Sequence, residues 1–259
     1  MDTKKMFKNF KNASDDLTSI AKKYGTDKAD GHFYTSHYET HFGKFRNKKI
    51  NLLEIGVGGY DKPDEGGESL RMWKEFFKNG NIFSIDIYDK HLLEEDRIKI
   101  FRGSQTDKAF LTSVVREIGP LDIIIDDGSH INSHVATSFN ILFPFLKIGG
   151  VYAIEDVQTS YWPDHGGDSF NLKKPNTTMN FFKNLTDGLN YEEFDNPYYT
   201  PSDFDKHIVS IHFYHNLIFL YKGLNNEGSL AARNDPIRKK KNRRRLKYIL
   251  RLIRSKLLI

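Results

Sequence analysis

The sequence predicts an α/β fold in which a doubly wound, mainly parallel sheet is covered by helices on both faces. From about residue 49 to residue 154, short apolar runs alternate with amphipathic segments, which is the pattern of buried strands and their covering helices. Farther along, β-rich runs at 207–213 and 217–222 flank a polar turn at 214–216. Runs this close together cannot be joined by a parallel crossover, so they predict a C-terminal antiparallel hairpin that closes the sheet.

The expected strands are runs of Ile, Leu, Val and Phe, and the expected helices are the amphipathic segments between them. In chain order, strands are expected at 50–55, 81–87, 98–101, 121–125 and 151–154. Helices are expected at 69–78, 107–118, 133–146 and 176–189. The segment before the first strand is rich in aromatic residues and histidine, and it is predicted to be either a structural cap or a lid over the site.

The 259-residue chain is long enough for one large domain with a substantial core. We divide it into a helical lead-in at 1–48, a main domain at 49–232 and a basic amphipathic tail at 233–259. Cysteine is absent, which excludes disulfides and thiolate metal sites, so any metal must bind carboxylates, histidines or water. The first residues lack the apolar core of a signal peptide and no run is long enough to span a membrane, so a cytoplasmic protein is expected.

The formal net charge of +5 is unevenly distributed. Residues 233–259 contain 12 Lys or Arg and one acid, Asp235, while the remainder of the chain carries an excess of acids. From residue 246 to residue 257, apolar residues recur every three to four positions, with basic residues on the other faces. This spacing predicts an interfacial helix at 238–259 on an anionic membrane surface, at the inner face of the membrane, with packing against a partner subunit as the alternative.

The strongest local signal is LLEIGVGGY, an apolar strand that ends in an acid and continues into a glycine-rich turn. Gly56 and Gly58 would let a ligand approach the backbone closely. A dinucleotide-binding loop would carry a third glycine where this chain has Asp61. Glu54 suits an ammonium group and Asp86, at the next strand end, suits ribose hydroxyls, although an ion pair and a helix cap are the structural alternatives. Together they predict a Rossmann-like site for S-adenosylmethionine rather than NAD.

Two later strands end in paired acids, in LDIIIDDGSH and GGVYAIEDVQ. If these strands are neighbours, their ends lie about 5 Å apart, and Asp127, Glu155 and Asp156 can converge on one cation. Clustered carboxylates repel one another, and a bound cation removes that repulsion. Because all three ligands are oxygens, Mg²⁺ is expected, with Mn²⁺ as a substitute. Exposed helix caps are the structural alternative.

His130 follows Asp127 by three residues on the same rim of the sheet. A neutral imidazole there can remove a proton from a hydroxyl, so we predict His130 as the catalytic base. The alternative is a structural histidine that hydrogen-bonds the loop. His37 and His41 are spaced like the histidines of zinc peptidases, but the acid between them is at the wrong position and no third ligand is evident, so we reject a peptidase.

These segments resemble the magnesium-dependent macrolide sugar O-methyltransferases, which are class I S-adenosylmethionine-dependent methyltransferases. The resemblance covers roughly residues 19–168 and runs through SIAKKYGTDKADGHFYTSHYETHF, LLEIGVGGY, GGESLRMWKEFF, IDIYDK, GSQTD, IIIDDGSH and IEDVQTSYWP. It implies that the three acids form a metal triad, that His130 is the base, and that Ser104 and Gln105 lie near the adenine. It also implies a homo-oligomer whose lead-in segments help to build the sites. The complete set of candidate cofactor-binding residues is Glu54, Gly56, Gly58, Ser69, Asp86, Ser104, Gln105 and Asp126.

The sequence therefore predicts a metal-dependent O-methyltransferase that transfers a methyl group from S-adenosylmethionine to a sugar hydroxyl. The acceptor would be a surface polysaccharide, a glycolipid or a glycosylated metabolite, with a sugar diol at the metal and His130 taking the proton. A methyltransferase for catechols or other small diols would use the same chelation and stays open. An RNA-binding protein on a degenerate Rossmann core is a third hypothesis, but the acidic main domain argues against a nucleic-acid partner.

Overall fold

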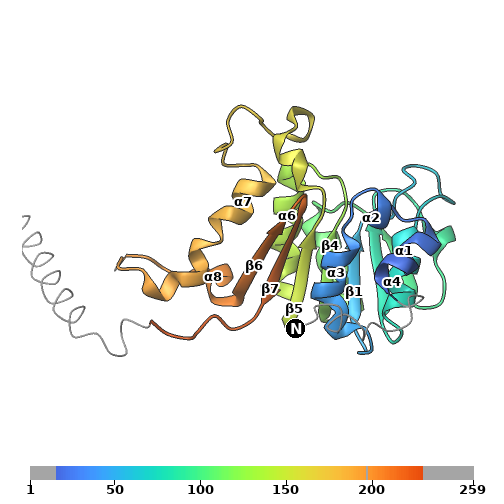
Figure 1. The fold of residues 1–259 in the computed structure, drawn as a ribbon, viewed down its shortest axis with the longest axis horizontal. Helices are drawn as coiled ribbons and strands as arrows, with labels where there is room; N and C mark the ends of the chain where they lie inside the picture. The colour runs from blue at the N-terminus through green and yellow to red at the C-terminus, as the bar shows by residue number, and fades with distance from the viewer. Residues whose placement is uncertain (1–15, 197, 230–259) are drawn as a thin grey trace, which may run out of the picture.

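The computed structural model describes residues 16–196 and 198–229. Its centre is a seven-stranded sheet with the order β3-β2-β1-β4-β5-β7-β6 (Figure 1). The strands are β1 (Asn51–Ile55), β2 (Asn81–Asp86), β3 (Ile98–Arg102), β4 (Leu121–Asp126), β5 (Leu146–Ile154), β6 (Ile208–Tyr214) and β7 (Leu217–Lys222). The pairs among β1 to β5 are parallel, whereas β7 runs antiparallel between β5 and β6. The predicted doubly wound sheet with a C-terminal hairpin is confirmed.

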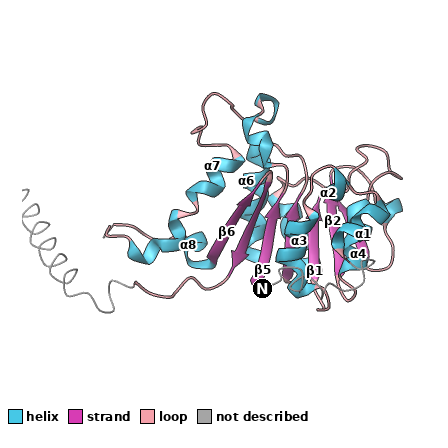
Figure 2. Cartoon of the chain, in the orientation of Figure 1, coloured by secondary structure: helices cyan, strands magenta, loops and turns pink. Residues whose placement is uncertain are grey.

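Helices lie on both sides of the strands (Figure 2). They are α1 (Leu17–Tyr24), α2 (Asp27–Asp30), α3 (Thr35–Phe42), α4 (Glu68–Phe76), α5 (Lys108–Ile118), α6 (Asn132–Leu142), α7 (Thr178–Asn184) and α8 (Asp203–His207). Buried side chains of α1, α3 and α4 form one core with one face of the sheet, and those of α5, α6 and α7 form a second core with the other face. None of the described helices is long and apolar enough to cross a bilayer.

Two expected helices are shorter than the sequence pattern suggests. The helix expected to reach residue 146 ends at Leu142, and a 3-10 turn at Phe143–Phe145 follows it. Pro144 explains the early end, because proline has no backbone N–H and its ring clashes with the preceding turn. The helix expected at 176–189 ends at Asn184 and is followed by a separate 3-10 segment at Asp187–Glu193. Apolar spacing alone therefore overestimated both lengths.

The lead-in packs against the sheet. Leu17 in α1 and Tyr38 and Phe42 in α3 are fully buried in the same core as Leu52 of β1 and Trp73 of α4. This shared core means that the described part of the lead-in does not pack as a separate body. Its role as a lid stays a prediction, and the predicted tail at 233–259 lies outside the described residues.

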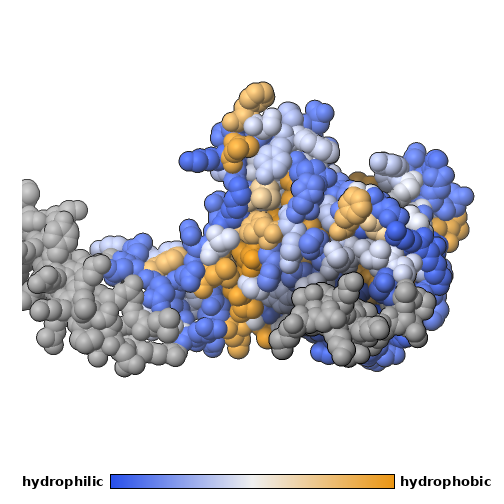
Figure 3. Space-filling view, viewed as in Figure 1, coloured by the Kyte–Doolittle hydropathy of each residue, from blue (hydrophilic) through white to orange (hydrophobic). Residues whose placement is uncertain are grey.

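Apolar and polar side chains are unevenly distributed over the face shown in Figure 3. Apolar side chains gather near its middle, over the β5–β7 part of the sheet, whereas hydrophilic side chains dominate over α1 and α4. On the edge strand β6, Val209 and Phe213 are exposed. The hairpin edge of the sheet is thus less well covered by other side chains than the part formed by β1 to β4, where the candidate site lies.

Candidate active site

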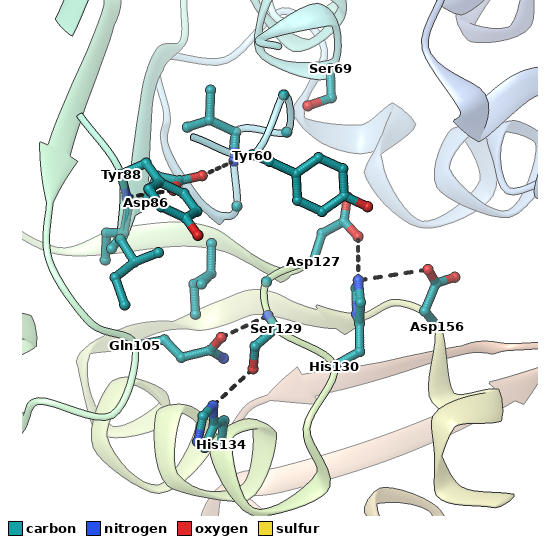
Figure 4. A pocket seen from close by; sticks show the side chains of 18 of the residues that line it. Tyr60, Ser69, Asp86, Tyr88, Gln105, Asp127, Ser129, His130, His134 and Asp156 are labelled. Atoms are coloured by element: carbon teal, nitrogen blue, oxygen red, sulfur yellow. Dashed lines mark hydrogen bonds and ion pairs between the residues drawn. The ribbon is translucent and has the colours of Figure 1, made fainter. Parts of the chain in front are cut away.

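A pocket of about 860 Å³ opens at the carboxyl ends of β1, β2 and β4 (Figure 4). Its walls come from the loops that follow these strands and β3, at 55–60, 85–88, 103–105 and 127–130, and from lead-in residues 25–28. The chain winds in opposite directions from β1 toward β2 and from β1 toward β4, as the strand order shows. Ligands of open α/β sheets bind at such a switch point.

The glycine loop after β1 lies directly against the end of β4. Gly56 has a φ of 99°, and a Cβ there would lie 2.2 Å from the carbonyl oxygen of Asp127, so no side chain fits. Gly58 also has a positive φ and lines the pocket. The backbone N–H of Val57 donates to Asp86 Oδ2 at 3.0 Å. This bond fixes the Asp86 carboxylate at the pocket wall, where the ribose was predicted.

Glu54 lies one layer beneath the pocket and does not line it. Its Oε2 atom accepts hydrogen bonds from Ser69 Oγ and Trp73 Nε1, each at 3.0 Å, and its Oε1 atom lies 3.4 Å from Lys28 Nζ. Burial raises the pKa of Glu54 to about 7, although Lys28 acts to lower it. Ser69 does line the pocket. The Glu54 carboxylate therefore holds a residue of the pocket wall in place.

A series of hydrogen bonds also orients the part of the pocket where the adenine is predicted to bind. Gln105 Nε2 donates to Asp126 Oδ1 at 3.2 Å, and its Oε1 accepts from the backbone N–H of Ser129 at 2.8 Å. Asp126 is buried and also accepts a short hydrogen bond from Ser138. Burial raises the pKa of Asp126 to about 6. Ser104 and Gln105 line the pocket and Asp126 does not, so Asp126 acts on the pocket through Gln105.

The acids at the ends of β4 and β5 surround a lysine from the lead-in. Lys28 Nζ lies 2.6 Å from Asp127 Oδ2 and 2.7 Å from Glu155 Oε1, and only 1% of the lysine is exposed. Burial lowers the pKa of Lys28, but Asp127, Glu155 and Glu54 together raise it well above its usual value. Lys28 therefore stays charged and partly neutralises the cluster.

Three more lead-in side chains contact the acids. Tyr38 donates its hydroxyl hydrogen to Glu155 Oε1 at 2.5 Å, and Tyr34 donates to Asp156 Oδ1 at 2.8 Å. His32 Nδ1 also lies 2.9 Å from Asp156 Oδ1. Although burial raises the pKa of Asp156, the hydrogen bond from Tyr34 contributes to holding it below its usual value. On both carboxylates, the lead-in donors meet at a single oxygen.

The acids form two adjoining groups rather than one. In the outer group, ligand atoms of Asp127, His130 and Asp156 lie within 4.8 Å of one another, and in the inner group those of Glu54, Asp127 and Glu155 do so. Asp127 belongs to both groups. Asp127 and Glu155 thus meet through the inner group and Asp127 and Asp156 through the outer one, while Glu155 and Asp156 share no group among the described residues.

His130 lies at the centre of the outer group (Figure 4). Its Nε2 atom is 3.8 Å from Asp127 Oδ1 and 3.8 Å from Asp156 Oδ2. Its Nδ1 atom is buried and has no hydrogen-bond partner among the described residues. Both His130 and Asp156 have positive φ angles, of 55° and 52°, a sparsely populated conformation that often marks functional sites.

No protein-family model matches the chain. Demethylmacrocin O-methyltransferase of Streptomyces fradiae is 47% identical to it over 222 residues, which are 85% of this chain and 56% of the relative. Mycinamicin VI 2''-O-methyltransferase of Micromonospora griseorubida is 46% identical over 219 residues, which are 84% of this chain and 55% of the relative. This chain is a homologue of the sugar O-methyltransferases.

The structure of this sugar O-methyltransferase homologue agrees with that relationship. A solved methyltransferase of the mycinamycin biosynthetic pathway, in complex with Mg and SAH (S-adenosylhomocysteine), matches it with a TM-score of 0.82 and 44% identity over 85% of this chain and 58% of that chain. The class I methyltransferase fold and the family resemblance read from the motifs are both confirmed. The homologue spans about half the length of the curated relatives it matches.

Sequence reasoning missed the lead-in residues of the homologue's site. Lys28, His32, Tyr34 and Tyr38 all contact predicted metal ligands, yet none of them was a candidate. One signal points to these residues: a buried cluster of acids needs a compensating cation, and the aromatic, histidine-rich lead-in is predicted to be a cap or a lid over the site. What could not be read from the sequence is which of its side chains reach the cluster.

Proposed function

We propose that this homologue transfers a methyl group from S-adenosylmethionine to a sugar hydroxyl, in a reaction that needs a divalent cation. The main support is His130, whose Nε2 lies 3.8 Å from both Asp127 and Asp156 in the same pocket as the glycine loop. A histidine, two acids and the glycine loop therefore share one cavity. The names of the relatives support the reaction class, since they describe O-methylation and one is named for a rhamnosyl tetracenomycin.

The loops at the carboxyl ends of β1, β2 and β3 would form the cofactor-binding half of the pocket. Asp86 would accept hydrogen bonds from the ribose hydroxyls, and Gln105 would lie at the adenine. The glycine loop, with Gly56 and Gly58, would let the methionine part of the cofactor pass close to the backbone. Ser69, held by Glu54, would face the amino-acid end.

Asp127, Glu155 and Asp156 would hold the divalent cation, with Asp127 as the ligand common to the inner group of Glu155 and the outer group of Asp156. Their oxygen donors fit Mg²⁺ or Mn²⁺, and Lys28 is the only buried cation in contact with this excess of carboxylates within the described chain. Lead-in donors meet at Oε1 of Glu155 and at Oδ1 of Asp156, so the second oxygen of each acid has no lead-in donor. When bound, the cation would make a hydroxyl in contact with it more acidic.

His130 would take the proton from the acceptor hydroxyl. Its Nδ1 is buried, so Nε2 is the nitrogen positioned to receive a proton from a ligand in the pocket. Once protonated, the imidazolium would be stabilised by the carboxylates of Asp127 and Asp156 on either side. The oxygen freed of its proton would then attack the methyl carbon while the sulfur leaves as a neutral thioether.

The first test is methyl transfer from labelled S-adenosylmethionine to rhamnosyl and other glycosides, with Mg²⁺ and with EDTA. Transfer is expected with Mg²⁺, with loss of activity in EDTA and recovery when excess Mn²⁺ is added, because the acids are proposed to hold the cation. Cofactor binding, measured by calorimetry, is expected to persist in EDTA. Full transfer in EDTA would show that the reaction needs no metal. Absence of cofactor binding would contradict the proposal that the protein is an S-adenosylmethionine-dependent methyltransferase.

We also propose a surface polysaccharide, a glycolipid or a glycosylated metabolite as the acceptor, a homo-oligomeric enzyme, and a location at the inner face of a membrane. The basic, amphipathic segment 238–259 supports the membrane location. Truncation before Arg238 is expected to abolish sedimentation with anionic vesicles at low salt and to leave cofactor affinity unchanged. Equal sedimentation of the full-length and truncated chains would contradict the proposed membrane location.

A further inference from the structure

Tyr60 ends the glycine loop and lines the pocket, yet it packs against little of the protein. The residue is 85% exposed, and its hydroxyl makes no hydrogen bond with any described residue. In Figure 4 its ring lies between the side of the pocket formed by Asp86 and the side formed by Asp127 and His130. A large aromatic side chain therefore lines the candidate site while most of its surface is exposed.

The backbone of Tyr60 is also strained. Its φ is 48°, in the left-handed region that bulky side chains disfavour. Five other described non-glycine residues have positive φ: Phe33, Arg97, His130, Asp156 and Asn216. Arg97 donates hydrogen bonds to three backbone carbonyls, and Asn216 lies in the tight turn between β6 and β7.

Tyr60 lies in a turn closed by the backbone N–H of Lys62, which donates to the carbonyl oxygen of Gly59 at 3.1 Å, but the Tyr60 hydroxyl has no hydrogen-bond partner among the described residues. His130 and Asp156 are strained within the site itself, and Phe33 does not line the pocket. Strained backbone that persists at a pocket is often part of how the pocket binds its ligand. The turn places the exposed Tyr60 ring at the pocket, and this placement points to a ligand group that the ring contacts.

The pocket geometry identifies that group, provided that the proposed function is correct. In S-adenosylmethionine the sulfur is bonded to the 5′ carbon of the ribose, and its methyl group must point toward the acceptor. The sulfonium must then lie between the ribose contact at Asp86 and the base at His130. In Figure 4 the Tyr60 ring borders this part of the pocket.

A sulfonium is a cation, and the face of a tyrosine ring attracts cations. A carboxylate would attract it too, but a carboxylate oxygen is a nucleophile that would compete with the acceptor for the methyl group. We propose that the Tyr60 ring contacts the sulfonium and makes the enzyme prefer charged S-adenosylmethionine over its neutral product, S-adenosylhomocysteine. Tyr60 would thereby also favour release of the product.

The test compares dissociation constants for both ligands, measured by calorimetry in Mg²⁺ buffer, in the full-length wild type, Tyr60→Leu and Tyr60→Phe. Tyr60→Leu is expected to weaken S-adenosylmethionine more than S-adenosylhomocysteine, by about 2- to 30-fold, which is the range of a cation–π contact. Tyr60→Phe keeps the ring and is expected to retain the wild-type ratio. Tyr198→Leu is the matched control, because Tyr198 is 83% exposed and does not line the pocket.

An equal loss of affinity for both ligands in Tyr60→Leu would overturn the proposal, because the ring would then contribute packing without distinguishing the charge. Unchanged affinity for both ligands in Tyr60→Leu would overturn it as well, although the proposed function would stand because the protein would still bind both ligands. A wild-type protein that binds neither ligand would instead refute the proposed function and this inference together.

Discussion

Replacing His130 with alanine is expected to reduce the turnover number for methyl transfer by about 10²- to 10⁴-fold, which is the usual contribution of a positioned base. The side chain has one nitrogen in the pocket, 3.8 Å from Asp127 Oδ1 and from Asp156 Oδ2, and no other histidine belongs to the outer group of the described chain. Initial rates at saturating cofactor and acceptor measure the effect. Affinity for S-adenosylmethionine should change little, because the proposed ribose and adenine contacts lie elsewhere in the pocket.

Asp86→Asn is the matched comparison for this variant. It keeps the shape of a residue in the same pocket but weakens the acceptor of the predicted ribose hydrogen bonds, so it should lower cofactor affinity more than turnover. If His130→Ala turned over within a few-fold of wild type, another group must take the proton. If both variants lost only cofactor affinity, His130 would belong to the binding site and the proposed base would be wrong.

Replacing Lys28 with methionine is expected to lower the free energy of unfolding by about 3–5 kcal/mol, which is the usual cost of removing one partner of a buried ion pair. The lysine is 1% exposed and lies within 3.4 Å of Glu54, Asp127 and Glu155. Methionine fills a similar volume but leaves these carboxylates without their cation. Chemical denaturation in metal-free buffer measures the loss.

Lys22→Met is the matched control, because Lys22 pairs with Asp30 in the same lead-in while both side chains are exposed. Pairs of that kind contribute at most about 1 kcal/mol. Adding Glu54→Gln to Lys28→Met removes one unpaired charge and should recover part of the stability, which keeps the test informative if the single variant folds poorly. Equal losses of unfolding free energy in Lys22→Met and Lys28→Met, or no recovery of stability in the double variant, would show that Lys28 does not compensate the negative charge of the acids.

The sequence alone determined the architecture and the position of the site along the chain. Alternating apolar and amphipathic segments predicted β1 to β5, and the turn at 214–216 predicted the hairpin. Parallel strands place their carboxyl ends at one edge, so the glycine loop, Asp86, Asp127 and His130 were expected to lie together. They do line one pocket. These features are local in the sequence, which is why periodicity and motifs could predict them.

Only the tertiary structure decided what surrounds the acids. Lys28 is 99 residues from Asp127 and 127 from Glu155, and no spacing rule connects an N-terminal helix to those strand ends. The structure also separated neighbours that the sequence had grouped: Glu155 faces the inner group and Asp156 the outer one. Successive side chains at a strand end point in different directions, and the positive φ of Asp156 turns the chain further. The burial of Glu54 beneath Ser69 was likewise invisible in the sequence, because burial depends on how α2 and α4 pack over β1.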